Sequence, residues 1–155
     1  MPEFIIAKTE EDYREARVLL REYEAASEVD LCFQGFEEEV EALERVYGPP
    51  GGRFLLMRAG DDTAGCVALR DLGNKICEMK RLYLRPGFRG RGLGRRSAER
   101  IVHEAREMGY AAMRLDTLPT MQEAITLYCS MGFREISPYT KNPVEGALFM
   151  EMGLG

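Results

Sequence analysis

The sequence predicts one α+β domain that covers residues 1–155, with a mixed, mostly antiparallel central sheet flanked by helices. A chain of 155 residues is the usual size of a single domain. Its composition, 45% hydrophobic and 30% charged, is typical of a globular protein. The spacing of apolar residues changes repeatedly between the helical and the strand period, which indicates that helices and strands alternate along the chain.

The first third of the chain predicts a strand followed by two helices. Residues 4–8 (FIIAK) form the strand. Thr9 is placed to cap a helix whose apolar face contains Tyr13, Ala16, Leu20 and Tyr23. A second helix, favoured by acids near its start, carries on one face Phe36, Val40, Leu43 and Tyr47. The run GPPGG at 48–52 ends this helix.

The middle of the chain predicts an antiparallel meander. Its three strands are expected at 53–59, 63–70 and 76–84. The turns between them are AGDDT and DLGNK, which are rich in turn-forming residues.

After Pro86 the helical period returns. A helix is expected with the apolar stripe Ala98, Ile101, Val102, Ala105 and Met108, ended by Gly109 as its C-cap. A strand follows at 111–118, and the next helix is marked by Met121, Ala124, Ile125 and Tyr128 and closed by Gly132. The final strands are expected at 133–136 and 146–152. Because a strand, a turn, a helix and a strand form a βαβ unit, the strands 76–84 and 111–118 should be parallel neighbours.

The composition argues against several classes of protein. No apolar run approaches the ~20 residues that span a bilayer, and the N-terminus lacks the basic start of a signal peptide. We therefore expect a cytoplasmic protein without a membrane partner. The net charge of −5 argues against nucleic acid as a partner.

The cysteines and the histidine do not have the spacing of a metal site. Cys32, Cys66, Cys77 and Cys129 are far apart, and His103 is the one histidine, which we interpret as a helix-face residue. Each cysteine lies in an apolar pattern and is expected to be a small buried side chain without a disulfide. A reactive thiol at one of them is the alternative.

One segment differs from the acidic remainder. Residues 85–96 (RPGFRGRGLGRR) contain five arginines and four glycines, and they lie where a strand ends and a helix begins. The first amides of a helix have no partner inside it, and the helix dipole is positive there. Glycines allow a bulky anion to approach, so a pyrophosphate is the expected ligand. The alternative is a solvated basic loop without a ligand.

Two common phosphate-binding motifs do not fit this segment. The P-loop pattern is absent, and Gly90 and Gly92 are followed by Arg95 where the dinucleotide-binding pattern requires glycine. An RNA-binding cluster would interleave aromatic residues among the arginines, and Phe88 alone does so.

The same segment resembles the signature of a known enzyme family. RGRGLG at 89–94 is similar to the Arg/Gln-x-x-Gly-x-Gly/Ala signature of the GNAT superfamily of N-acetyltransferases. AITLYCSMGF at 124–133 resembles the family's Ala-x-x-Leu-Tyr-x-x-x-Gly-Phe helix, and the order of elements fits over the whole chain. The resemblance implies a GNAT-like sheet in which one parallel βαβ unit forms the coenzyme A site.

The resemblance also implies a ligand and the residues that bind it. Acetyl-CoA would be the acetyl donor, and no metal would be needed. The backbone of Leu82, Tyr83 and Leu84 would hydrogen-bond the pantetheine arm. The pyrophosphate would be held by the amides of the turn, namely Arg89, Gly90, Arg91, Gly92, Leu93, Gly94 and Arg95.

Two catalytic residues follow from the resemblance. Tyr128 would protonate the departing thiolate, and Glu78 would take a proton from the attacking amine. A backbone N–H near Leu82 would stabilise the oxyanion. The structural alternatives are a core tyrosine and a strand glutamate paired with Lys80 or Arg81.

The acceptor is implied as a primary amine of a small molecule or peptide, which attacks the donor directly in a ternary complex. Tyr139, Asn142 and Glu145, in the loop 137–149, are the candidate substrate residues. The acids at 37–41 suit a cationic amine, or they form a solvated helix face.

The family often has asparagine where this chain has Met121, and Thr117 or Thr120 could take over that contact. A non-catalytic acyl-CoA sensor is the alternative function. A homodimer is possible.

Overall fold

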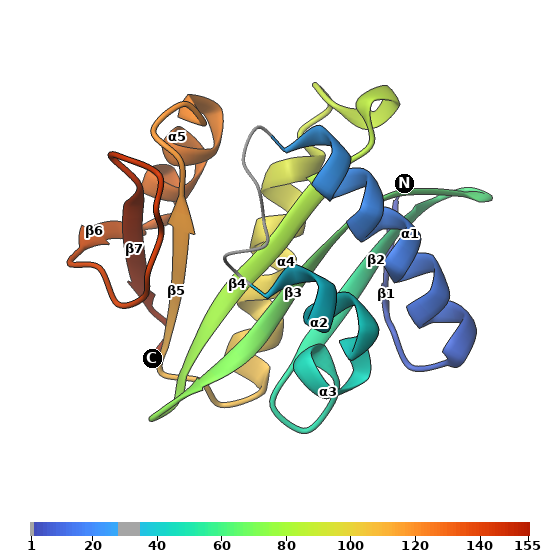
Figure 1. The fold of residues 1–155 in the computed structure, drawn as a ribbon, viewed down its shortest axis with the longest axis horizontal. Coiled ribbons are helices and arrows are strands. Elements are labelled where there is room, and N and C mark those ends of the chain that lie inside the picture. Colours follow the sequence, from blue (N-terminus) through green and yellow to red (C-terminus); the bar gives the residue numbers. More distant parts are fainter. Residues whose placement is uncertain (1, 28–34) are drawn as a thin grey trace.

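The computed structural model describes residues 2–27 and 35–155. In chain order the elements are β1 (Glu3–Ile6), α1 (Glu10–Ala26), α2 (Phe36–Glu41), α3 (Leu43–Tyr47), β2 (Arg53–Ala59), β3 (Asp62–Gly73), β4 (Ile76–Leu84), a 3₁₀ turn (Pro86–Phe88), α4 (Leu93–Glu107), β5 (Ala112–Thr117), α5 (Gln122–Met131), β6 (Arg134–Ile136) and β7 (Leu148–Gly153) (Figure 1).

The described strands form one seven-stranded sheet in the order β1-β2-β3-β4-β5-β7-β6. Every neighbouring pair is antiparallel except β4 and β5, which are parallel. The predicted fold class and the predicted parallel pair are therefore confirmed. Figure 1 shows that β4 and β5 lie together at one end and diverge toward the other.

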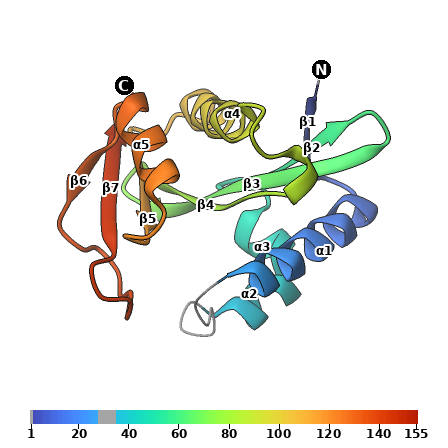
Figure 2. The ribbon, with the colours of Figure 1, turned by 90° about the horizontal axis from the view of Figure 1, so that it is seen from above.

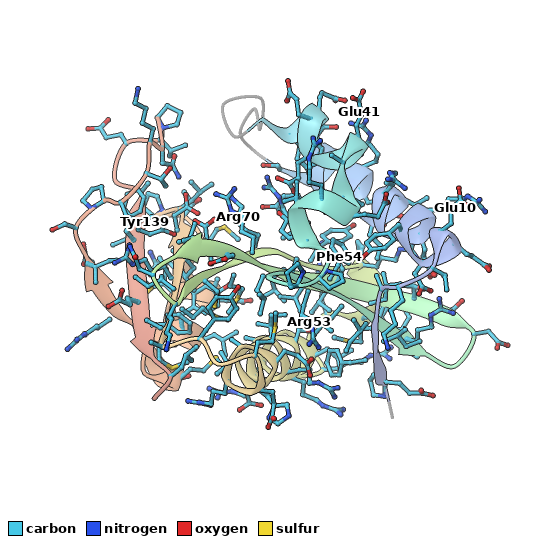
Figure 3. All side chains as sticks on the ribbon, turned by 90° about the horizontal axis from the view of Figure 1, so that it is seen from below. Glu10, Glu41, Arg53, Phe54, Arg70 and Tyr139 are labelled. Carbon is cyan, nitrogen blue, oxygen red and sulfur yellow. The ribbon has the colours of Figure 1, made fainter. Side chains whose placement is uncertain are left out.

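Helices cover both faces of the sheet (Figure 2). On one face α4 packs through the expected stripe, including Ala98, Ile101 and Ala105. On the other face α1, α2 and α3 cover a second cluster with Phe36 and Tyr47. Figure 3 shows the alternation along β2, where Phe54 points to the α1 side and Arg53 to the α4 side.

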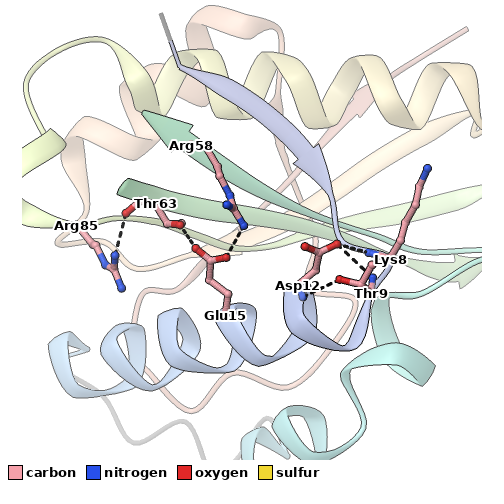
Figure 4. Close-up of polar contacts among 7 residues, drawn as sticks. All are labelled: Lys8, Thr9, Asp12, Glu15, Arg58, Thr63 and Arg85. Carbon is pink, nitrogen blue, oxygen red and sulfur yellow. Dashed lines mark hydrogen bonds and ion pairs between the residues drawn. The ribbon is translucent and has the colours of Figure 1, made fainter. Parts of the chain in front are cut away.

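The start of α1 is fixed by the predicted cap. The Thr9 hydroxyl accepts a hydrogen bond from the Asp12 amide at 3.0 Å, and the Asp12 carboxylate accepts from the Thr9 amide at 3.2 Å (Figure 4). This reciprocal pair is a capping box. The predicted second helix is different, because it is broken at Ala42, where φ is −118° and ψ is 39°, into α2 and α3.

Polar contacts then tie α1 to the sheet next to the glycine-arginine turn. Glu15 on α1 accepts from Arg58 at 2.6 Å and from the Thr63 hydroxyl (Figure 4). Arg85, the first residue after β4, donates to the Thr63 carbonyl at 2.9 Å and pairs with Glu22 at 2.7 Å. The helix is therefore held against the strand end that leads into the turn.

A β-bulge in β4 places an arginine in an unusual conformation. Tyr83 pairs with Cys66 and Lys80 pairs with Ala68, so β4 has one residue more than β3 over this stretch. Arg81 lies in the bulge with φ of 60°. Its guanidinium donates two hydrogen bonds to Glu39, at 2.8 and 2.7 Å.

The Arg81–Glu39 pair is buried, with side-chain exposures of 1% and 9%. The Tyr47 hydroxyl donates to the same carboxylate at 2.8 Å. Although burial opposes it, Arg81 holds the pKa of Glu39 below its ordinary value. The acids of α2 therefore do not all form a solvated face, because Glu39 is internal whereas Glu37, Glu38 and Glu41 are exposed.

The described cysteines are free thiols. Cys66 and Cys77 are buried, and burial raises the pKa of each to about 12. The prediction of burial is wrong for Cys129, which is exposed because it lies on the outer side of α5. Cys32 lies outside the described residues.

No helix in 2–27 and 35–155 is long and apolar enough to cross a bilayer. In the same ranges, no three His, Cys, Asp or Glu side chains gather as a metal site would require.

The buried Arg81–Glu39 pair leads to a prediction about stability. Glu39→Gln leaves the Arg81 guanidinium buried without its counter-charge, and we expect unfolding to become easier by about 3–5 kcal/mol. Urea denaturation followed by circular dichroism measures this change. The matched control is Glu44→Gln, because Glu44 forms an exposed pair with Arg17 at 2.9 Å; this substitution should cost at most about 1 kcal/mol. Equal effects of the two substitutions would contradict the prediction.

Candidate functional site

A cleft of about 710 Å³ opens where β4 and β5 diverge. Their pairing comprises Ile76–Ala112, Cys77–Met113 and Glu78–Arg114, and it stops there. Both strands continue beyond this point, β4 to Leu84 and β5 to Thr117. The residues of these free ends line the cleft, together with the end of α1, the turn before α4 and the start of α5.

The glycine-arginine turn forms one end of the cleft. Gly90 and Gly92 have φ of 78° and 75°, a conformation that glycine adopts without strain. A Cβ built on either would meet nothing within 4 Å, so the space above the turn is open. The N-cap of α4 is Gly92, which offers no side chain to the first amides of the helix. These amides have no partner inside the helix and can receive an anion.

Most of the predicted cofactor residues are brought together by this arrangement. The cleft is lined by Leu82, Tyr83, Leu84, Arg89, Gly90, Gly92, Leu93 and Gly94. Arg91 and Arg95 are not among its lining residues. The Arg91 guanidinium lies 5.6 Å from the centre of the Phe88 ring, and Arg95 donates to the Ser130 hydroxyl.

Tyr128 lines the same cleft from α5. It is 7% exposed and packs edge-on against Phe133, with 5.7 Å between the ring centres. Burial raises the pKa of Tyr128 above its ordinary value, so the phenol keeps its proton at neutral pH. Tyr128 is thus a core residue that also lines the cleft.

Glu78 is placed differently from Tyr128. Its side chain is 1% exposed and is not among those that line the cleft. One carboxylate oxygen accepts from Arg70 Nε at 2.8 Å, and the other accepts from the Tyr139 hydroxyl at 2.6 Å. Figure 3 shows Arg70 and Tyr139 on the same side of the sheet. Arg70 and Tyr139 therefore hold the Glu78 carboxylate, whereas Arg81, one of the partners suggested by the sequence, pairs with Glu39.

The loop between β6 and β7 carries the three candidate substrate residues. Asn142 lines the cleft and donates to the Asp116 carboxylate at 3.2 Å. Tyr139 faces Glu78, and burial together with Glu78 raises the pKa of Tyr139. Glu145 is exposed and lies outside the lining of the cleft. A second hollow of about 540 Å³ is lined by Pro138, Thr140, Lys141, Asn142, Pro143 and Phe149.

Four charged residues that line the cleft were missed in the sequence, of which Arg81 and Glu123 are two. Lys80 of β4 and Asp116 of β5 both line it. Burial, with Arg81 nearby, lowers the pKa of Lys80. Lys80 and Asp116 each lie two residues beyond the last paired residues of β4 and β5, and the sequence does not show where that pairing ends.

Met121 lies at the entrance to α5, at the place where the family often has asparagine. It lines the cleft and is 48% exposed. The Thr117 hydroxyl lies 3.8 Å from its sulfur atom, and both Thr117 and Thr120 also line the cleft. The two threonines considered from the sequence are thus present beside Met121.

Known proteins resemble this chain in both sequence and structure. Residues 11–133 match the Acetyltransferase (GNAT) family. An uncharacterised N-acetyltransferase of Schizosaccharomyces pombe is 40% identical over 147 residues, which cover 94% of this chain and 90% of the relative.

Solved structures share the fold at lower sequence identity. A GNAT-family acetyltransferase from Staphylococcus aureus superposes with a TM-score of 0.79 at 22% identity, and all of both chains is covered. A Salmonella typhimurium protein solved with its cofactor acetyl-CoA has a TM-score of 0.71 at 18% identity, covering 99% of this chain and 94% of that one.

The family match covers most of the chain, and the fold and the cleft agree with it. The chain therefore belongs to the GNAT family of acetyltransferases.

Proposed function

We propose that residues 1–155 form one catalytic domain that transfers an acetyl group from acetyl-CoA to the primary amine of a small molecule or peptide. The GNAT family uses acetyl-CoA as its donor, and this part of the function follows from membership. The rest of the proposal is supported by one cleft, which is lined by the end of β4 beyond its pairing with β5, by the glycine-arginine turn and by the buried Tyr128.

The cleft has the properties that this donor requires. Its volume of about 710 Å³ lies within the ~300–1,000 Å³ range of ligand pockets. The backbone of Leu82, Tyr83 and Leu84 would bind the pantetheine arm as a neighbouring strand would. The amides from Arg89 to Arg95 would hold the diphosphate, with open space above Gly90 and Gly92.

The donor supplies an acetyl thioester to the site. The acceptor nitrogen forms a bond to the carbonyl carbon, the carbon–sulfur bond breaks, and Tyr128 gives its proton to the departing sulfur. A phenol whose pKa is raised by burial is in the correct protonation state for this step. A backbone N–H near Leu82 would stabilise the charge on the carbonyl oxygen.

Glu78 would accept the proton of the amine through Tyr139. The Tyr139 hydroxyl donates to Glu78 at 2.6 Å, and neither side chain is among those that line the cleft, so a water molecule would carry the proton from the amine to this pair. Arg70 keeps Glu78 in place during this transfer. The proposed relay needs no direct contact between the buried carboxylate and the substrate.

Gly94 provides a test of donor binding. It lies in the first turn of α4 without a positive φ, and a Cβ there would touch Leu84 at 3.8 Å. Gly94→Ala should leave stability unchanged or raise it by up to about 1 kcal/mol. It should also weaken coenzyme A binding roughly tenfold, because the added methyl group would hinder the approach of the diphosphate to amides that keep their N–H groups. Calorimetry and thermal melts measure both effects, with Gly87→Ala as the control outside the cleft. Unchanged affinity would argue against diphosphate binding at this turn.

Tyr128→Phe separates an enzyme from a sensor. Loss of the hydroxyl should lower kcat by ~10²–10⁴-fold while the affinity for coenzyme A stays within about twofold. Thiol release measures turnover, and calorimetry measures affinity. The control is Tyr110→Phe, which removes a hydroxyl that donates to the Gly51 carbonyl, away from the cleft. Full turnover in Tyr128→Phe would remove this tyrosine from the mechanism.

The relay is tested by Glu78→Gln and Tyr139→Phe. Each should lower kcat/KM by ~10²-fold or more at pH 7. The loss should shrink as the pH approaches ~10, because an amine then deprotonates in solution and needs no base. Thiol release across pH 6–10 gives the two profiles. A deficit that stays constant with pH would mean that both residues only support the loop.

A further inference from the structure

We propose that the acceptor is a primary amine attached to an aromatic or similarly large apolar group, which lies in the second hollow while the amine lies in the cleft. This inference rests on the proposed function, because it names the acceptor class of the same site. It is carried by the position of the second hollow on the sheet and by the residues that line it.

The second hollow lies beside the cleft on the same face of the sheet. Phe149 of β7, which lines the hollow, pairs directly with Asp116 of β5, which lines the cleft. Side chains directly opposite each other in an antiparallel pair share one face, with their Cβ atoms about 4.5–5.5 Å apart. Asn142 lines both spaces. A ligand that extends from the cleft across β5 therefore reaches the hollow within one strand spacing.

Tyr139 connects the second hollow to the proposed base. Its ring packs edge-on against Phe149, with 5.5 Å between the ring centres, and its hydroxyl donates to Glu78 at 2.6 Å. The Arg114 guanidinium lies 5.2 Å from the centre of the same ring. An apolar group that packs on Phe149 would thus keep its amine close to the pair that is proposed to take up the proton.

The lining of the second hollow suits an apolar group. Phe149 is 5% exposed and belongs to the sheet, so its ring is a fixed surface. Pro138 and Pro143 add two side chains whose rings lock the backbone, so the loop loses little conformational freedom when it packs on a ligand. A volume of about 540 Å³ is sufficient for a ring. An aromatic group there gains apolar burial and an edge-on contact.

The charges around the second hollow argue against a polyamine. Among the described residues that line it, Lys141 is the one with a charge, and Lys141 is exposed. Glu145 of the same loop is not among the lining residues, nor are the exposed acids of α2, which are Glu37, Glu38 and Glu41. A second ammonium group placed there would meet a like charge. The acceptor is therefore expected to have one positive charge, on the amine that reacts.

The first experiment compares phenethylamine with ethanolamine as acceptors by thiol release from acetyl-CoA. Both have a primary amine on a two-carbon chain, which ends in a phenyl ring or in a hydroxyl group. We expect kcat/KM for phenethylamine to be higher by about 10–100-fold, the range for burial of a side chain as large as phenylalanine. Ethanolamine is the less basic amine, so the protonation of the amine alone would favour ethanolamine. Equal values, or a preference for ethanolamine, would overturn the inference.

Thr140→Trp assigns this preference to the second hollow. Thr140 is an exposed lining residue, and tryptophan there would occupy the space proposed for the ring. We expect kcat/KM for phenethylamine to fall about tenfold or more and that for ethanolamine to stay within about twofold. The matched control is Thr126→Trp, because Thr126 is exposed on α5 and lines neither space. An unchanged value for phenethylamine in Thr140→Trp would place the ring elsewhere and contradict the proposal.

The charge requirement is tested with hexylamine and 1,5-diaminopentane, which differ in a terminal methyl group against a second ammonium group. In the wild type, hexylamine should be the better acceptor by about tenfold or more, because the ammonium group would lose its water without a counter-charge. Lys141→Glu should reduce this ratio about 3–5-fold, the size of an exposed charge interaction. Lys8→Glu, at an exposed position ahead of α1, should leave the ratio unchanged. A preference of the wild type for the diamine would identify a polyamine acceptor and refute the inference.

The outcomes separate this inference from the proposed function. Coenzyme A binding with acetylation of ethanolamine, but without a preference for the apolar amines, overturns the inference and leaves the acetyltransferase intact. Coenzyme A binding without acetylation of any of the four amines overturns the inference and favours the sensor. Absence of coenzyme A binding overturns both the inference and the proposed function.

Discussion

The divergence of β4 from β5 after Glu78 and Arg114 is the constraint on which the cleft depends. If the pairing continued, the backbone N–H and C=O groups of the two strands would hydrogen-bond to each other, and the space between the strands would close. The two strands diverge because each is held by its own outer neighbour. β3 pairs with β4 as far as Leu84, and β7 pairs with β5 as far as Thr117. Neither strand can leave its neighbour to close the gap, so the cleft is preformed.

The β3–β4 contact also fixes the turn that follows. A Cβ on Gly65 would lie 2.0 Å from the Tyr83 carbonyl oxygen, so the two backbones approach in a way that only glycine allows. The Arg85 amide donates to the Ala64 carbonyl at 2.8 Å and carries the pairing one residue past the strand. The glycine-arginine turn therefore begins from a fixed point, and its amides open onto the cleft without a further rearrangement.

Local patterns in the sequence predicted the elements, and the βαβ rule predicted the parallel pair. Thr9 was predicted as the cap of α1, and the apolar stripe of α4 indicated the buried face of that helix. The features that the sequence did not predict depend on contacts between residues that are far apart in the chain. A glutamate-rich helix is normally solvated, yet Glu39 is drawn inward by Arg81, 42 residues away in the chain. The positive φ of Arg81 was hidden too, because glycine or asparagine would be expected there.

The candidate site likewise has one part that the sequence predicts and one part that it does not. The half proposed for the donor is built from the backbone of one continuous segment, β4 and the turn after it, so a short motif indicates it. The half proposed for the acceptor is built from side chains of β4, β5 and the loop between β6 and β7. Tyr139 meets Glu78 across 61 residues of chain, and Asn142 meets Asp116 across 26. No local pattern could place these groups together.

This division explains why the family signature identifies the chemistry but not the substrate. The backbone that would hold the donor tolerates many side chains, provided that the glycines of the turn remain. The groups that would meet the acceptor can change one at a time without altering the sheet, because strand pairing fixes their positions and not their identity.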